Sequence, residues 1–324
     1  MSVSHLPDGT LVYNNPNGNV YFAGGDDANC TVSACPIELS VYGYRPSIPA
    51  SATLIALYAI CMGIQAILGF RYKKWGFMSA MILGCFDEIL GYVGRILYWQ
   101  NPWKQDGFIM QIVLITIGPV FFSAAIYVLL AQIVEYISVK HSRFAPKWIY
   151  WIFIPCDILS LILQAVGGAM SSTSNGSSDA GVNIALAGLC FQVATLVAFA
   201  ALCVDYAIRS RSVWMAARLP RRLTIFIGFL TAATILILLR CCYRVYELSE
   251  GYSRDSEALR DETLFIALES VMVVLSAFCL VGAHPGFVFK TGQEHLTSDE
   301  WTAEKQFQNG SQSSETSPDS AVRV

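Results

Sequence analysis

The chain has 324 residues, of which 54% are hydrophobic and only 14% are charged. A soluble domain of this length is about a quarter charged, so the composition excludes an ordinary soluble domain and indicates a protein that lies mostly in lipid. The net charge of −3 identifies no class of partner, because acidic and basic residues are segregated along the chain.

The first 40 residues are polar, and they lack the basic start and apolar core of a cleavable signal peptide. We expect residues 1–40 to be an extracytoplasmic and largely disordered segment. Cys30 and Cys35 lie here, apart from the eight cysteines in or beside apolar runs. An extracytoplasmic compartment favours a disulfide between these two. Asn29 begins an Asn-Cys-Thr triplet, which predicts a glycosylation site.

Seven apolar stretches follow, and each is close to the length of about 20 residues that a helix needs to cross a bilayer. They lie at residues 49–70, 77–98, 108–133, 148–170, 182–206, 223–243 and 264–284. Membrane barrel strands are shorter and alternate in polarity, so helices are the expected element. The sequence predicts an all-α protein with one seven-helix membrane domain over residues 41–287. We expect the polar tail over residues 288–324 to be disordered.

Basic residues mark one side of the predicted bundle. They follow the first, third and fifth spans, as in the run from Arg209 to Arg222, whereas residues 171–181 contain none. Cytoplasmic loops carry the excess of Lys and Arg, so we predict the N-terminus outside and the C-terminus inside. A second glycosylation triplet, at Asn175, falls on the predicted outer side.

Charged and amide side chains interrupt several of these spans. Such residues are costly in hydrocarbon, so we expect them to face the bundle interior. A spacing of three or four residues places those of one span on one helix face. The candidate site residues are Glu88, Tyr92 and Arg95 of the second span, Gln111 of the third, Asp157 and Gln164 of the fourth, Gln192 of the fifth, Arg240, Arg244 and Glu247 near the end of the sixth, and Glu269 of the seventh. Counting along the spans predicts that opposite charges meet in the outer half of the membrane.

Two interpretations of these polar residues stay open. In the first, they line a cavity that binds a lipid head group or another amphiphile. In the second, they form an ion-pair and hydrogen-bond network that only specifies how the helices pack, since pairing lowers the cost of burying a charge without adding net stability.

The sequence argues against an enzyme. It contains no Gly-x-x-x-x-Gly-Lys-Ser/Thr loop to cradle phosphates, which disfavours an ATP-driven pump. Its four histidines are too few and too scattered for a metal hydrolase, and the seventh span has no lysine for a retinal Schiff base. We therefore predict no cofactor, no metal and no nucleic-acid partner.

Several motifs resemble those of the fungal lipid-translocating exporter family, the seven-helix proteins associated with resistance to aminocholesterol. They include Tyr42-Gly43-Tyr44-Arg45-Pro46-Ser47, Glu88-x-x-Gly91-Tyr92-x-x-Arg95, Asp157-x-x-Ser160-x-x-x-Gln164 and Arg240-x-x-Tyr243-Arg244-x-x-Glu247. The resemblance covers about residues 41–287. The chain departs from the family pattern at Gln132, where an arginine is expected, at Ser253, where a glycine is common, and at Glu269, where an aspartate is expected.

The resemblance implies a multi-pass protein of the plasma membrane that moves lipids or other amphiphiles, such as sphingoid long-chain bases, and contributes to resistance to toxic amphiphiles. Its partners would be an amphiphilic small molecule and membrane lipids. The candidate ligands are Arg95, Arg240 and Arg244 for an anionic head group, or Glu88, Asp157 and Glu269 for an ammonium group. The alternative is a seven-helix receptor or sensor of lipid or membrane stress, without transport activity.

Overall fold

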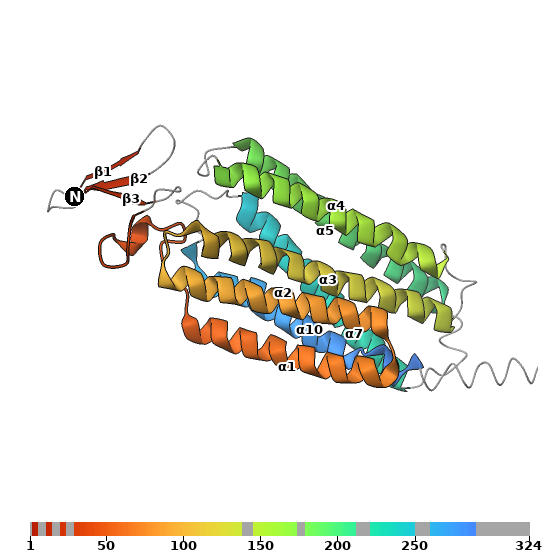
Figure 1. Ribbon diagram of the computed structural model, residues 1–324. Coiled ribbons are helices and arrows are strands. Elements are labelled where there is room, and N and C mark those ends of the chain that lie inside the picture. Colours follow the sequence, from red (N-terminus) through yellow and green to blue (C-terminus); the bar gives the residue numbers. More distant parts are fainter. Residues whose placement is uncertain are drawn as a thin grey trace, which may run out of the picture.

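The computed structural model describes residues 2–5, 11–14, 20–23, 29–137, 145–173, 179–211, 221–249 and 260–289. Within these ranges, seven helical segments are long and apolar enough to cross a membrane, and they run side by side in one elongated bundle (Figure 1). Six are α1 (Ile48–Tyr72), α2 (Trp75–Gln100), α3 (Gln105–Ile137), α4 (Pro146–Thr173), α5 (Asp179–Arg209) and α7 (Arg221–Ser249). The seventh joins α9 (Glu262–Leu264), the π-helix η3 (Phe265–Val271) and α10 (Met272–Gly282). The predicted all-α fold with seven spans is confirmed.

The local sequence explains where α1 begins and ends. The Ser47 side chain accepts a hydrogen bond from the backbone N–H of Ala50 and so caps the helix. Pro49 lies in the first turn, where the N–H that it lacks would have no helical partner. Lys73 follows the last helical residue with a left-handed φ of 55°, which ends α1 and turns the chain toward α2.

Helix α3 lies at the centre of the bundle. Neighbouring helices pack in chain order from α1 to α5, then α5 packs on α7, and α10 contacts both α7 and α1. Helix α3 also contacts α7 and α10. In its apolar 18-residue stretch 61% of the residues are buried, a larger share than in any other described span. Figure 1 shows α3 between the α4–α5 pair and the α1–α2 pair. Polar residues of the outer ring of helices can therefore meet against α3.

The outward faces of the helices are apolar. Ile67, Phe70, Trp151 and Ile208 are each more than 60% exposed at the surface of the bundle. A soluble monomer rarely exposes contiguous apolar patches of this extent, whereas lipid chains solvate such a surface. The chain is therefore an integral membrane protein, and its polar side chains are turned inward.

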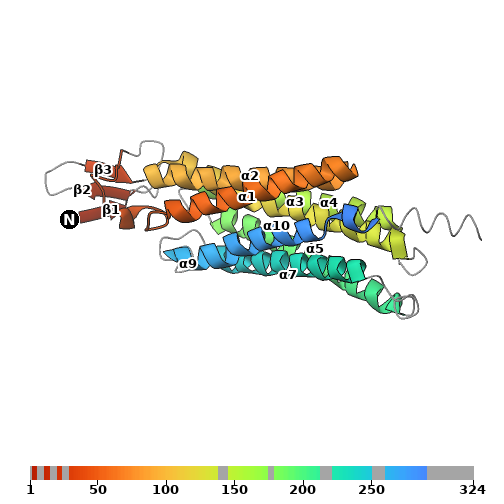
Figure 2. The same ribbon diagram turned by 90° about the horizontal axis from the view of Figure 1, so that it is seen from below.

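The N-terminal segment contains a small antiparallel sheet. Strands β1 (Ser2–His5), β2 (Leu11–Asn14) and β3 (Val20–Ala23) pair in that order. This differs from the largely disordered segment that we predicted. The polar composition of residues 1–40 conceals three four-residue runs with Val, Leu, Tyr and Phe, which favour strands. Figures 1 and 2 place the sheet at the end of the bundle where α1 begins, which we call the N-terminal end.

The last short elements lie at the opposite end of the bundle. The chain leaves α10 through a single 3-10 turn, η4 (Pro285–Phe287), which packs on α1. The predicted disordered tail lies outside the described residues from position 290 onward. The N-terminal sheet and residue 289 therefore mark the two ends of the bundle, as an odd number of spans requires.

Candidate functional site

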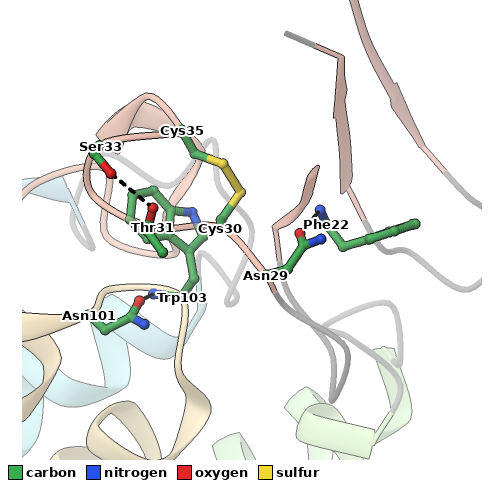
Figure 3. Close-up of a disulfide and its surroundings, with 8 residues drawn as sticks. All are labelled: Phe22, Asn29, Cys30, Thr31, Ser33, Cys35, Asn101 and Trp103. Carbon is green, nitrogen blue, oxygen red and sulfur yellow. Dashed lines mark hydrogen bonds between the residues drawn. A yellow bond between two sulfur atoms is a disulfide. The ribbon is translucent and has the colours of Figure 1, made fainter. Parts of the chain in front are cut away.

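A disulfide loop joins the N-terminal segment to the bundle. Cys30 and Cys35 form a disulfide and are buried in one cluster with Tyr13 of β2 and Trp103, which lies between α2 and α3 (Figure 3). The Trp103 ring lies against the bridge in the close-up view. This contact fixes the segment over the connection between α2 and α3.

The first predicted glycosylation site lies beside this loop. Asn29 is exposed, and its Oδ1 accepts a 2.7 Å hydrogen bond from the backbone N–H of Phe22 (Figure 3). Glycosylation of Asn29 stays a prediction, now placed on a surface residue. The second predicted acceptor, Asn175, lies outside the described residues.

The motif that begins at Tyr42 folds back onto α2 and α3. The side-chain amide of Gln111 donates a 2.9 Å hydrogen bond to the Tyr42 hydroxyl, and the Tyr98 hydroxyl accepts from the backbone N–H of Tyr42 at 3.4 Å. Arg45 donates to the backbone carbonyl of Trp99, and its guanidinium carbon lies 4.0 Å from the centre of that ring. Burial raises the pKa of Tyr42, which precedes the first span, well above its usual value. Its hydroxyl therefore stays neutral and acts only as a hydrogen-bond partner.

Arg95 ties this motif to the start of the seventh span. Its Nη2 donates to the Tyr44 hydroxyl at 3.1 Å and lies 3.4 Å from Oε1 of Glu262. The same Glu262 oxygen accepts the backbone N–H of Ser47 at 2.7 Å. The Phe265 ring centre lies 4.2 Å from the Arg95 guanidinium carbon. One of the three arginines proposed to bind an anion is thus already held by three elements at the N-terminal end of the bundle.

A buried ion pair joins the sixth and seventh spans. Arg240 donates from Nε at 2.9 Å and from Nη2 at 2.6 Å to the same oxygen, Oε1 of Glu269. Nη2 also donates to the backbone carbonyl of Ile115 in α3 at 3.0 Å. The two side chains are 1% and 0% exposed, and Glu269 lies in the π-helical turn η3. Removal of Arg240 would leave the Glu269 carboxylate without its partner in the core.

Glu88 lies beside this ion pair. It is 0% exposed, and neither carboxylate oxygen has a hydrogen-bond partner within the part of the chain that the structure describes. Arg240 and Glu269 are close enough to act on it electrostatically, and so is the Tyr58 hydroxyl, which does not meet hydrogen-bond geometry. Gly118 of α3 makes room for the carboxylate, because a Cβ there would lie 2.7 Å from Oε1 of Glu88.

A second pair lies on α7, nearer the N-terminal end. Arg244 binds Glu247 one turn along the same helix, and its Nη2 also donates to the Thr116 hydroxyl of α3 at 3.4 Å. Glu269 and Arg240 both act electrostatically on Glu247. The structure therefore brings Glu88, at the middle of α2, close to the Arg240–Glu269 pair, with the Arg244–Glu247 pair one turn nearer the N-terminal end on α7. That these charges lie in the outer half of the membrane stays a prediction. We call Glu88, Arg240 and Glu269 the central cluster.

Asp157 belongs to a different network. Its Oδ2 accepts a 2.9 Å hydrogen bond from the Tyr127 hydroxyl, and its Oδ1 accepts from Thr195 at 3.3 Å. Within the described ranges, no hydrogen bond or ion pair connects it to Glu88 or Glu269. That Asp157 shares one ammonium with Glu88 and Glu269 stays a prediction. Its stripe on α4 faces α3 and α5, whereas the central cluster lies among α2, α3, α7 and η3.

The two remaining amide candidates also join α4 to α5. The Gln164 amide donates a 3.1 Å hydrogen bond to Oε1 of Gln192. The helices approach closely here, because a Cβ on Gly167 would lie 2.4 Å from the backbone nitrogen of Ala185. This α4–α5 network has the character of the packing interpretation, in which small residues and amides hold helices together.

Sequence reasoning missed several residues of the site. Tyr58 comes from the first span, which we treated as simply apolar, and its ring stacks on Tyr92 at a centroid distance of 6.0 Å. Ser270 lies next to Glu269, and its buried hydroxyl is near that of Tyr92. A usable signal existed on α1, where Tyr58 and Gln65 share one helix face at a spacing of seven residues. In the described ranges, no three His, Cys, Asp or Glu side chains gather as a metal site requires.

Comparison with known proteins agrees with the motif resemblance. A family model described as RTA1 like protein matches residues 81–292. The sphingoid long-chain base transporter RSB1 of Saccharomyces cerevisiae is 30% identical over 291 residues, which cover 78% of this chain and 75% of that protein. Protein RTM1 of the same yeast is 29% identical, over 71% of this chain and 77% of its own length. Protoporphyrin uptake protein 1, also from this yeast, is 28% identical, with coverage of 66% and 71%. No solved structure matches.

Proposed function

Because this chain belongs to the RTA1-like family, we propose that it moves lipids or other amphiphiles across a membrane. The proposed substrate class is a single-chain amphiphile with a cationic amine head group, as in sphingoid long-chain bases. One similar yeast protein supports this class, since it is named as a transporter of sphingoid long-chain bases. Another, named as an uptake protein for protoporphyrin, supports only the broader proposal of amphiphile movement. Residence in the plasma membrane and a contribution to resistance against toxic amphiphiles belong to the same proposal.

The unpaired carboxylate of Glu88 is the observation on which this proposal rests. Arg240 and Arg244 already bind Glu269 and Glu247, so neither is free for an anionic head group without breaking a buried ion pair. Glu88, in contrast, offers two oxygens to a cation. An ammonium group carries three N–H donors, and a nearby aromatic face such as that of Tyr58 stabilises a cation further.

Transbilayer movement in proteoliposomes tests the proposal. A fluorescent long-chain base is placed in one leaflet, and its arrival in the other leaflet is followed by quenching. We expect the wild-type protein to accelerate the movement, and we expect Glu88→Gln to reduce the protein-dependent rate at least tenfold. That reduction corresponds to the loss of one charge-assisted contact of about 1.5–3 kcal/mol.

Asp87→Asn is the matched control. Asp87 is the next residue on α2, it is only half-buried, and it acts on Glu88 through its charge alone. Asp87→Asn therefore removes one carboxylate charge at the same depth without removing a hydrogen-bond or ion-pair partner from the described contacts of the central cluster. This variant should retain the wild-type rate. Equal rates for Glu88→Gln and wild type would contradict the assignment of Glu88. Absence of any protein-dependent movement, together with ligand-dependent binding of a cytoplasmic partner, would favour the receptor alternative.

A further inference from the structure

Glu88, Asp157 and Glu269, three of the buried carboxylates in the described spans, differ in how they are neutralised. Glu269 shares its charge with Arg240 through two hydrogen bonds. Asp157 receives one hydrogen bond on each oxygen, from Tyr127 and Thr195. Glu88 alone of these three is fully buried with neither oxygen bonded in the described part of the chain. An ionised carboxylate in such surroundings is costly, so it takes up either a proton or a cation.

The charge balance of the central cluster points the same way. It contains two carboxylates, Glu88 and Glu269, and a single guanidinium, Arg240. Since Arg240 binds Glu269 directly, ionised Glu88 leaves the cluster with one uncompensated negative charge. A proton on Glu88 removes that charge, and so does a bound ammonium group. The two cannot occupy the carboxylate together, because the ammonium requires its anionic form.

We infer that Glu88 binds a proton and the cationic head group in alternation, an inference that rests on the proposed function. The protein would then exchange a proton for a cationic amphiphile across the membrane. A cation R–N⁺ that enters the site meets the protonated carboxyl of Glu88. The O–H bond breaks, the proton leaves to water, and the carboxylate pairs with the cation. No redox partner or nucleotide is needed, and the gradient of protons supplies the driving force for the amphiphile.

The groups that face Glu88 are consistent with proton exchange. They are Tyr58 from α1, Cys85 and Tyr92 from α2, Arg240 from α7 and Glu269 from η3, while α3 contributes Gly118. The half-buried Asp87 acts on Glu88 through its charge alone. Arg240 is the one cation among them, and Glu269 engages it. Among these groups no unengaged cation pairs with Glu88. A proton or a bound cation must therefore neutralise its carboxylate.

Buried polar groups continue from Glu88 in both directions along the described part of the bundle. Tyr92 lies one turn nearer the N-terminal end on α2, with the buried Ser270 hydroxyl beside it, and Arg95 follows on the next turn. Buried hydroxyls of this kind take water or ligand partners. In the other direction α2 packs on apolar residues that include Met81 and Phe122, and the buried Gln65 amide lies on the same face of α1 as Tyr58.

A long-chain trimethylammonium probe separates this inference from the proposed function. The quaternary nitrogen can neither bind nor release a proton, so a change in lumenal pH must come from the protein. Proteoliposomes contain a pH-sensitive dye, and the movement of the fluorescent probe is recorded with the dye signal. For the wild type we expect one proton to move against each probe molecule. A gradient of one pH unit should hold a tenfold probe gradient at steady state, since both correspond to about 1.4 kcal/mol. Glu88→Gln should abolish both effects, and Asp87→Asn should preserve them.

These measurements distinguish failure of the proton exchange from failure of the proposed translocation. Movement of the long-chain base or the probe by the wild type without proton counterflow would overturn the exchange and leave translocation intact. Absence of protein-dependent movement of either molecule would overturn both proposals. Proton-coupled movement that persists in Glu88→Gln would overturn the role of Glu88.

A measurement on the wild type alone applies even where Glu88→Gln does not fold. Acidification protonates Glu88 and excludes the cation. The affinity for the trimethylammonium probe should therefore fall up to tenfold for each pH unit once the carboxyl titrates. An affinity that does not change with pH would overturn the proposal.

Discussion

The ion pair between Arg240 and Glu269 offers a quantitative test of the central cluster. Arg240→Met removes the guanidinium that binds Glu269, the one that does so among the described residues, and leaves two carboxylates facing each other in the core. Breaking a buried pair in this way costs about 3–5 kcal/mol of unfolding free energy. Glu269→Gln has a smaller expected effect, because the amide oxygen still accepts from Arg240 and the carboxylate of Glu88 becomes its counter-ion. We expect a loss of about 1–3 kcal/mol, typical of a weakened charged hydrogen bond.

The difference between the two variants is the informative quantity. It should be about 2 kcal/mol, or roughly thirtyfold in the folding equilibrium. Denaturation of the purified protein in mixed detergent micelles, followed by intrinsic tryptophan fluorescence, measures it. The double variant, with methionine at both positions, should be more stable than Arg240→Met alone, because no carboxylate is then left facing Glu88. Equal losses of unfolding free energy for Arg240→Met and Glu269→Gln would refute the reasoning. They would mean that the carboxylate of Glu88 does not compensate the charge of Arg240 when Glu269 is replaced.

Two glycine substitutions test the packing around the site and the α4–α5 network. Gly118→Ala should leave the fold intact, because the added methyl group meets the flexible carboxylate of Glu88, but it should slow amphiphile movement severalfold. Gly228→Ala on α7 is the control. A Cβ there meets nothing within 4 Å, so the rate of movement should be unchanged. Equal rates for both variants would show that the position of the carboxylate is unimportant. Gly167→Ala should lower the unfolding free energy by about 1–3 kcal/mol, because its methyl group meets the backbone of α5, whereas Gly168→Ala has open space and should have little effect. Thermal unfolding of the purified variants compares the two, and equal melting temperatures would contradict the close approach.

The membrane spans could be predicted because hydrocarbon selects residues by a local property. Six of the seven predicted spans lie within observed helices, and the seventh ends two residues beyond the last residue of α10, Gly282. The helices run through Pro119 in α3 and Pro155 in α4 without a break. A long apolar run in lipid stays helical even at a proline, because leaving backbone groups unpaired there is costly. The strands of the N-terminal segment were missed for the opposite reason. Four-residue runs carry little local signal, and their pairing depends on neighbouring strands.

The candidate site could be predicted as a set of residues but not as a set of contacts. Helical spacing placed Glu88, Asp157 and Glu269 on inward faces, and all three are buried. It could not tell that Asp157 bonds Tyr127, or that Arg240 binds Glu269 and leaves Glu88 unpaired. Those partners come from other helices, whose order and rotation around α3 no single span encodes.

The number of spans and the inward direction of their polar residues follow from the sequence, because the cost of a charge or an open backbone group in hydrocarbon is paid residue by residue. The choice of partner for each buried charge was decided only by the tertiary structure. Glu88 and Glu269 are both glutamates at comparable depth, and the packing of α7 against η3 directs the single guanidinium to Glu269. That assignment leaves Glu88 as the carboxylate on which function is proposed to depend.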